Sequence, residues 1–228
     1  MLIAFEGVDG SGKSTAAKKF SEMLKQRYGD DRVVLTRDPG GTDVALDIRN
    51  TILGNDMDPI TELLLYSAAR REIYVNVIRP ALMHNKIVIS DRFVDSTIVY
   101  QHHARIDERD CAQLNDIEML HEIACENARP DLTFIMDTSV EIVKSRIDTR
   151  NEESNRFDLM GEKFFDDVVK GFAQIGQGNR RYKFIDAGNT IDEVQSELQL
   201  VFDNFLLKSA SKSYIDYGAK GPSVNLVR

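Results

Sequence analysis

The chain has 228 residues, of which 42% are hydrophobic and 29% are charged, and its formal net charge is −8. This composition is typical of a globular protein with a full hydrophobic core. The negative charge argues against general binding to nucleic acid or to an anionic membrane. The sequence also has no uninterrupted apolar run of roughly 18 residues, the length that a membrane span needs.

The two cysteines, Cys111 and Cys125, lie in a segment with a helical pattern. A helix would separate them by about 20 Å, which is too far for a disulfide bond. Unpaired thiols are typical of proteins in a reducing compartment, so we expect a cytoplasmic protein.

Short apolar runs alternate with longer helical segments along the chain. Five runs rich in Val, Ile and Phe predict buried strands, at residues 2–6, 32–36, 87–90, 132–136 and 182–186. Helical patterns predict helices near residues 13–28, 43–53, 59–83, 110–127, 139–149, 161–175 and 191–207. This alternation predicts an α/β fold in which helices cover a parallel sheet.

Some boundaries of these elements can be predicted from single residues. Asp58 followed by Pro59 is a good cap and first position for the helix that begins there. Pro80 should kink or end the same helix. The polar residues 150–160 predict an excursion from the domain, and the residues after 207 lack periodicity and predict a tail.

The first strand leads directly into GVDGSGKST, residues 7–15. This stretch matches G-x-x-x-x-G-K-[ST], a loop whose backbone N–H groups bind phosphates at the start of a helix. Lys13 should reach the outer phosphates, and Ser14 should ligate magnesium. The motif predicts a nucleoside triphosphate site formed by Gly7, Val8, Asp9, Gly10, Ser11, Gly12, Lys13, Ser14 and Thr15.

A phosphate loop does not by itself name the reaction. A GTPase switch would carry a guanine-reading Asn-Lys-x-Asp, but Asn85-Lys86 is not followed by that Asp. A motor or helicase would be larger and more basic. Both classes are therefore disfavoured.

Charged residues follow two of the predicted strands. Arg37 follows the second, and Asp91 and Arg92 follow the third, at the strand ends where open parallel sheets bind ligands. Asp91 is placed to bind magnesium through water, and the two arginines to hold a second phosphate. The alternative is that they are surface arginines paired with neighbouring acids such as Asp38 and Asp91.

These motifs resemble those of the thymidylate kinase family. FEGVDGSGKST resembles its phosphate loop, TRDPGGT its usual Thr-Arg-Glu-Pro-Gly-Gly-Thr, and RPDLTFIMD its fourth strand. LLLYSAARREIYVNVIRPAL and SDRFVDSTIVYQ resemble its thymine and acceptor segments. The resemblance departs at Asp38, where Glu is usual, at His102-His103, where glycines are frequent, and in VVKGF, which lacks a common arginine.

The resemblance implies a P-loop NTPase fold: a five-stranded parallel sheet of order 2-3-1-4-5 covered by helices, with a short lid. It covers residues 1–207, which we expect to form a single kinase domain with the lid at about 146–160 and a tail at 208–228. It also implies a homodimer, dTMP as the acceptor, and ATP and Mg²⁺ as phosphoryl donor and metal.

The resemblance further implies an acceptor site formed by Asp9, Arg37, Tyr66, Arg70, Arg92, Ser96, Thr97, Tyr100 and Gln101. Arg37 and Arg92 would bind the dTMP phosphate, and Asp9 would lie near the 3′-hydroxyl. Tyr66 would stack on the base, and Arg70 would donate to thymine O4. The alternative is that Tyr66 is a core residue and that Arg70 reaches solvent.

The predicted lid contains several arginines in the stretch RIDTRNEESNRFD. Since the variable positions of the phosphate loop include no arginine, we expect Arg150 and Arg156 to stabilise the transition state and Arg146 to lie nearer the adenine. The alternative is a solvated loop whose arginines offset its acids.

A nucleotide acceptor fits better than a nucleoside acceptor, because a phosphate oxygen is already anionic and needs no base to remove a proton. The leading prediction is therefore thymidylate kinase activity. The alternatives are a broader deoxynucleoside monophosphate kinase acting on dTMP, dUMP and dGMP, a deoxynucleoside kinase, or a non-catalytic nucleotide-binding module.

Overall fold

The computed structural model describes residues 1–105, 111–149, 157 and 160–218. It contains a five-stranded parallel sheet of order β2-β3-β1-β4-β5. The strands are β1 (Leu2–Glu6), β2 (Val33–Arg37), β3 (Ile87–Asp91), β4 (Leu132–Asp137) and β5 (Tyr182–Asp186). The predicted strands, their parallel pairing and their order are confirmed.

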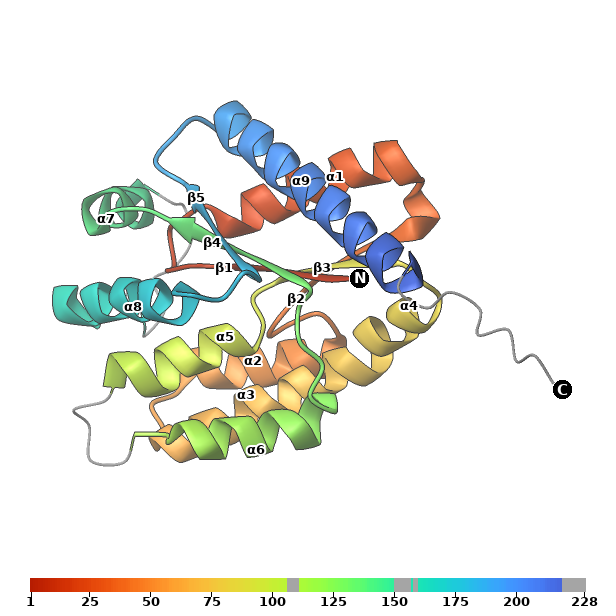
Figure 1. Cartoon of the computed structure of the whole chain (residues 1–228). Helices are drawn as coiled ribbons and strands as arrows, with labels where there is room; N and C mark the ends of the chain where they lie inside the picture. The colour runs from red at the N-terminus through yellow and green to blue at the C-terminus, as the bar shows by residue number, and fades with distance from the viewer. Residues whose placement is uncertain (106–110, 150–156, 158–159, 219–228) are drawn as a thin grey trace, which may run out of the picture.

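Helices cover both faces of the sheet (Figure 1). They are α1 (Lys13–Tyr28), α2 (Asp43–Gly54), α3 (Pro59–Ile73), α4 (Arg79–Met83), α5 (Val94–Thr97), α6 (Leu114–Cys125), α7 (Val140–Thr149), α8 (Gly161–Gly176) and α9 (Ile191–Gly218). Short π and 3-10 turns are Asp30–Arg32, Tyr74–Ile78, Ile98–His102 and His103–Arg105. In Figure 1, α1 and α9 lie on one side of the sheet, and α2, α3, α5 and α6 lie on the other. None of the described helices is long and apolar enough to cross a membrane.

The central strand β1 shows how the sheet separates two cores. Leu2 and Ala4 pack on the side of α3 and α6, whereas Ile3 and Phe5 pack on the side of α1 and α9. Successive side chains of a strand point to opposite faces, so a central strand must be apolar at both sets of positions. This explains why β1 has apolar residues at every position before Glu6 and does not alternate between apolar and polar residues.

The helix that begins at Pro59 has the predicted cap, because the Asp58 carboxylate accepts from the N–H groups of Ile60 and Thr61. It does not end at Pro80. Instead, the backbone widens into the π-turn Tyr74–Ile78 and continues as α4. Proline has no N–H, and its ring would meet the carbonyl four residues before it, so a widened turn just ahead of it relieves the conflict.

Residues 94–105 are helical, which the sequence analysis did not predict. Val, Ile and Thr make this stretch a weak helix former. The Glu6 carboxylate at the end of β1 accepts from the N–H groups of Phe93 at 2.8 Å and Ser96 at 3.3 Å. A buried carboxylate from another strand therefore supplies the cap that the local sequence lacks.

The C-terminal helix is longer than expected. Helix α9 runs from Ile191 to Gly218, so the chain is still helical beyond residue 207, where the tail was expected to begin. The last ten positions, 219–228, lie outside the described residues.

Candidate active site

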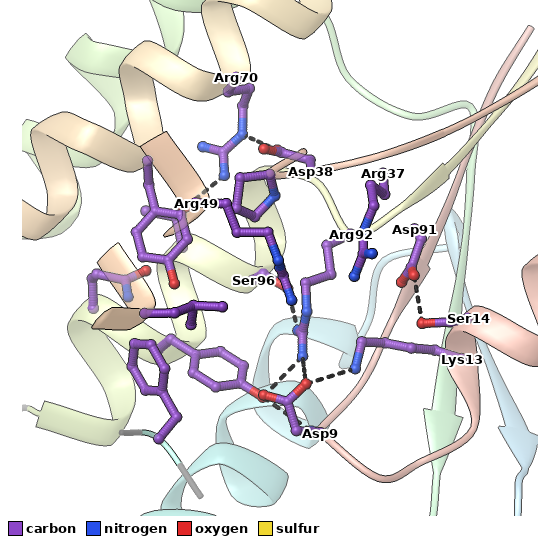
Figure 2. Close-up of a pocket in the computed structure, with 17 residues that line it drawn as sticks. Asp9, Lys13, Ser14, Arg37, Asp38, Arg49, Arg70, Asp91, Arg92 and Ser96 are labelled. Atoms are coloured by element: carbon purple, nitrogen blue, oxygen red, sulfur yellow. Dashed lines mark hydrogen bonds and ion pairs between the residues drawn. The ribbon is translucent and has the colours of Figure 1, made fainter. Parts of the chain in front are cut away.

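A cleft of about 200 Å³ opens at the carboxyl ends of β1, β2 and β3 (Figure 2). All nine residues of the expected acceptor site line it, together with Lys13, Ser14 and Asp91. The expected acceptor residues are Asp9, Arg37, Tyr66, Arg70, Arg92, Ser96, Thr97, Tyr100 and Gln101. Five further residues line the cleft that were not expected there from the sequence: Asp38, Pro39, Arg49, Leu53 and Phe157.

The phosphate loop joins β1 to α1 through glycines whose backbone angles disfavour any other residue. Gly12 caps α1 with φ 86°, in the left-handed region. A Cβ at Gly7 would lie 2.9 Å from the carbonyl oxygen of Met136. The loop therefore packs tightly against β4 and directs backbone N–H groups toward the start of α1.

Asp9 lies between two cations of the cleft. Its Oδ1 accepts from Lys13 Nζ at 3.2 Å and from Arg92 Nη2 at 2.7 Å. Burial opposes ionisation of Asp9, but Arg92 and Lys13 outweigh it and hold the pKa of this carboxyl below its ordinary value. The carboxylate thus occupies a position suited to an anion, and a phosphate that enters would compete for the same two cations.

Ser14 and Asp91 meet at the end of β3, where the sequence predicted a magnesium site. Ser14 donates to Asp91 Oδ2 at 2.5 Å. The other carboxylate oxygen, Oδ1, is buried and has no hydrogen-bond partner among the described residues. A hydroxyl and one carboxylate fit Mg²⁺, which keeps several waters and takes its remaining ligands from phosphates.

Arg37, Arg49 and Arg92 extend into the same part of the cleft (Figure 2). A Cβ at Gly40 would lie 3.4 Å from Arg49 Cδ and 3.5 Å from Arg37 Cδ, so these two side chains flank the same glycine. Within the described part of the chain, neither Arg37 nor Arg49 has a hydrogen-bond or ion-pair partner. The cluster can therefore accept a dianionic group.

Arg49 was missed by the sequence analysis, although the sequence contained a signal for it. It lies four residues after Ala45 and three before Ile52, both fully buried, so it is on the inner face of α2. Burial and the neighbouring charges of Arg37 and Arg92 lower its pKa. An arginine on the buried face of the helix after TRDPGGT is the pattern that could have identified it.

Arg92 is held by contacts on both terminal nitrogens. Nη1 donates to the Gly7 carbonyl at 3.1 Å and to Ser96 Oγ at 2.7 Å. Nη2 donates to Asp9 and, at 3.1 Å, to Tyr100 Oη. Arg92 is paired with an acid, as in the alternative prediction, but the acid is Asp9 rather than Asp38 or Asp91, and the arginine is largely buried.

The contacts of Arg92 continue inward to Glu6. Ser96 Oγ, which accepts from Arg92, donates to Glu6 Oε2 at 2.5 Å. Complete burial and the nearby Asp95 raise the pKa of Glu6 to about 8, although Arg92 acts in the opposite direction. Asp95 is in turn paired with Arg181, whose Nη2 lies 2.8 Å from Asp95 Oδ1.

Arg70 lines the cleft and is only 3% exposed, so the alternative prediction that it reaches solvent is wrong. Its Nε donates to Asp38 Oδ2 at 2.5 Å, and its Nη2 donates to Thr97 Oγ1 at 2.7 Å. Burial opposes its charge, but Asp38 raises its pKa above the ordinary value. Asp38 is thus the partner that Arg70 lacks on its own helix.

Aromatic side chains form one wall of the cleft. The Tyr100 ring lies 6.1 Å from that of Phe157, 6.0 Å from Phe164 and 6.3 Å from Phe172, all edge to face. Tyr66 packs on the same cluster. This wall offers flat apolar surface close to the arginines, as a nucleoside requires.

A second cavity of about 250 Å³ lies beside the phosphate loop, and Gly12, Thr15, Arg146, Asn189 and Gln195 contribute to its lining. Arg146 donates to the carbonyls of Ser11 at 3.2 Å and Ala187 at 2.8 Å. It therefore joins the loop to the segment after β5. The two arginines expected to be catalytic, Arg150 and Arg156, lie outside the described residues.

One phosphate loop thus separates two cavities, and the first of them is lined by Arg37, Arg49 and Arg92. Together with the 2-3-1-4-5 sheet, this arrangement defines a P-loop phosphotransferase of the nucleotide kinase class.

Comparisons with known proteins identify the family within this class. The thymidylate kinase family model matches residues 5–198. A thymidylate kinase of Staphylococcus haemolyticus (strain JCSC1435) is 37% identical over 207 residues, which cover 90% of this chain and 98% of that protein. One of Mycoplasma capricolum subsp. capricolum is 42% identical over 202 residues, 86% of this chain and 92% of that protein. A crystal structure of thymidylate kinase from Ehrlichia chaffeensis aligns with a TM-score of 0.70 and 36% identity, over 89% of this chain and 98% of that chain. The chain belongs to the thymidylate kinase family.

Proposed function

We propose that this protein transfers the γ-phosphoryl group of ATP to dTMP, forming dTDP and ADP for the synthesis of dTTP. The observation that carries the proposal is the pair Arg37 and Arg49, which have no partner among the described residues and lie beside Arg92. Three guanidinium groups facing Lys13 across one cleft fit an acceptor that already carries a phosphate. A nucleoside acceptor would need a general base rather than these cations.

In the proposed reaction, the residues of the chain position and neutralise two phosphate groups. Lys13 holds the outer phosphates of ATP, and Arg37, Arg49 and Arg92 hold the phosphate of dTMP, whose anionic oxygen attacks without losing a proton. Asp9 is displaced from Lys13 and Arg92 and becomes available to the 3′-hydroxyl of the sugar. Mg²⁺, held by Ser14 and through water by Asp91, would neutralise charge on the phosphates of ATP.

The two ends of ATP are assigned to different parts of the site. The adenosine would occupy the second cavity, beside Arg146, while its phosphates lie along the loop from Gly7 to Thr15. Arg150 and Arg156 would stabilise the charge that develops on the transferred group. This division places the acceptor and donor on opposite sides of Lys13.

A broader deoxynucleoside monophosphate kinase is the second candidate. Guanine O6 accepts a hydrogen bond as thymine O4 does, so Arg70 does not distinguish dGMP from dTMP. Only the size of the cleft would exclude dGMP. Uracil keeps O4 and lacks only the 5-methyl group, which contributes about 1 kcal/mol, so dUMP should be a poorer substrate.

A coupled assay of ADP release with dTMP, dUMP, dGMP and thymidine tests the proposal. We expect rapid turnover with dTMP, slower turnover with dUMP, and little with dGMP or thymidine. Thymidine as the preferred acceptor would instead identify a nucleoside kinase, and comparable rates for dTMP and dGMP would identify the broader enzyme. If no acceptor causes ADP release, the protein would be a non-catalytic nucleotide-binding module.

We also propose that the protein forms a homodimer through the outer faces of α3 and α6. Ile60 and Leu64 on α3 are 38% and 50% exposed, and Met119 and Ile123 on α6 are 56% and 67% exposed. Each pair is four residues apart and so forms an apolar stripe on its helix. Analytical ultracentrifugation of the protein and of Ile123→Lys would test the proposal, and a monomeric parent protein would refute it.

A further inference from the structure

A buried ion pair supports the cleft behind Gln101. Glu62 on α3 is fully buried, and Arg105 is 5% exposed. Arg105 Nη2 lies 3.1 Å from Glu62 Oε1 and 3.3 Å from Oε2. Since a buried carboxylate stays ionised only when a cation or several donors compensate it, Arg105 keeps Glu62 charged.

This charge fixes the orientation of the Gln101 amide. An ionised carboxylate can only accept hydrogen bonds, so the part of Gln101 that faces Glu62 must be its NH₂ group. The Gln101 Nε2 to Glu62 Oε1 distance is 2.9 Å. The amide oxygen therefore points away from Glu62. Gln101 lines the acceptor cleft, and its Oε1 has no hydrogen-bond partner within the described part of the chain.

Gln101 and Arg70 line the same cleft. Thr97, which accepts from Arg70 Nη2, precedes Gln101 by one helical turn, and both line the cleft. The cleft thus offers a donor group on Arg70 and an acceptor oxygen on Gln101. Thymine and uracil present the complementary pair, an accepting O4 beside a donating N3–H. Cytosine presents the reverse, a donating amino group beside an accepting N3.

We infer that Glu62, kept ionised by Arg105, is a specificity-determining positioning residue that locks the Gln101 amide with its oxygen toward the N3–H of the acceptor base. The inference rests on the proposed function, because it takes a pyrimidine nucleotide as the occupant of the cleft. Glu62 itself touches no substrate. Its role is to prevent the half-turn of the amide that would present NH₂ to the N3 of cytosine.

The substitution Glu62→Gln tests this role, because a neutral amide at position 62 can face either end of Gln101. We expect the ratio of kcat/KM for dTMP to that for dCMP to fall at least ~10-fold, with the KM for ATP unchanged. The double variant Glu62→Gln with Gln101→Glu should restore the preference. Its carboxylate at position 101 can only accept, and the amide at position 62 can donate to it.

Glu72→Gln serves as the matched control, because Glu72 lies on the same helix and its carboxylate accepts from Asn76 at the surface. Thermal unfolding would show that each variant is folded. A folded Glu62→Gln variant that keeps the parent ratio would overturn the inference. If that variant does not fold, Arg105→Met decides, because it removes the cation beside Glu62: a lower ratio of dTMP to dCMP turnover supports the inference, and the parent ratio overturns it. Failure of the parent enzyme to phosphorylate dTMP would instead refute the proposed function.

Discussion

Arg70 on α3 and Asp38 in the loop after β2 form a buried ion pair, although they are 32 residues apart in the sequence. The side chains of both are at most 4% exposed. Arg70 also donates to Thr97, and its guanidinium carbon lies 5.8 Å from the centre of the Phe93 ring. The guanidinium is therefore fixed before any base enters the cleft, which reduces the entropy lost on binding.

Arg70→Ala should abolish the preference for dTMP over dCMP. In the parent protein the amino group of cytosine would face the N–H groups of Arg70, and both can only donate; the variant removes this conflict. The energy at stake is about 1–3 kcal/mol, or roughly 5- to 150-fold in kcat/KM. The change should also destabilise the fold by about 3–5 kcal/mol, since Asp38 becomes a buried unpaired charge. Steady-state kinetics with both nucleotides and urea unfolding measure the two effects.

Arg71→Ala is the matched control for that experiment. Arg71 is the next residue on α3, but its side chain is 41% exposed and lies 3.6 Å from Glu126 at the surface. Its removal should change stability by less than about 1 kcal/mol and leave selectivity intact. If Arg70→Ala behaves in the same way as Arg71→Ala, Arg70 does not read the base.

Arg92→Lys should reduce kcat/KM for dTMP by at least about tenfold. An ammonium keeps the charge but cannot reproduce the fork that contacts Gly7, Ser96, Asp9 and Tyr100 together. The measurement is a kinetic comparison with Arg32→Lys, a change at an exposed arginine. Equal kcat/KM values in the two variants would show that charge alone suffices.

Arg150→Ala and Arg156→Ala test the proposed lid. A lid arginine that acts mainly on the transition state should lower kcat at least ~10²-fold when it is removed, with only a modest change in KM. Arg180→Ala, at an exposed arginine before β5, controls for the loss of one positive charge. Normal turnover in both lid variants would mean that the catalytic cation comes from elsewhere.

Glu6 should make the stability of the protein depend on pH. Burial and Asp95 raise its pKa from 4.5 to about 8, so the folded state binds a proton more tightly than the unfolded state does. The resulting stabilisation is complete below about pH 4.5 and is lost as the pH rises to 8. Glu6→Gln should therefore flatten the decline of the unfolding free energy over this interval.

Urea unfolding of the parent protein and of Glu6→Gln at pH 5, 6.5 and 8 measures this dependence. Because other groups titrate in both proteins, only the difference between the two profiles is attributed to Glu6. Glu22→Gln, at an exposed position on α1, should give a profile parallel to that of the parent. A Glu6→Gln profile that is also parallel to the parent would contradict the raised pKa.

The parts of this protein whose structure is local could be predicted from the amino-acid sequence. The phosphate loop is contiguous from Gly7 to Thr15, so its glycine spacing specifies the turn. The buried strands could be predicted because each is a short apolar run. The start of the helix at Pro59 could be predicted because its cap, Asp58, directly precedes it. The positions of Arg37 and Asp91 followed as well, because the ends of parallel strands meet at one edge of a sheet.

The pairing of the buried charges could not be predicted in this way, because it depends on how distant segments pack. The partners of Arg70, Gln101 and Arg105 lie 32, 39 and 43 residues away in the sequence, and the packing of α3 against the sheet brings them together. Helix α5 likewise depends on Glu6, which is 87 residues from Phe93. Propensity and periodicity describe a residue and its near neighbours, whereas a buried charge is satisfied by whichever distant group the packed chain places beside it.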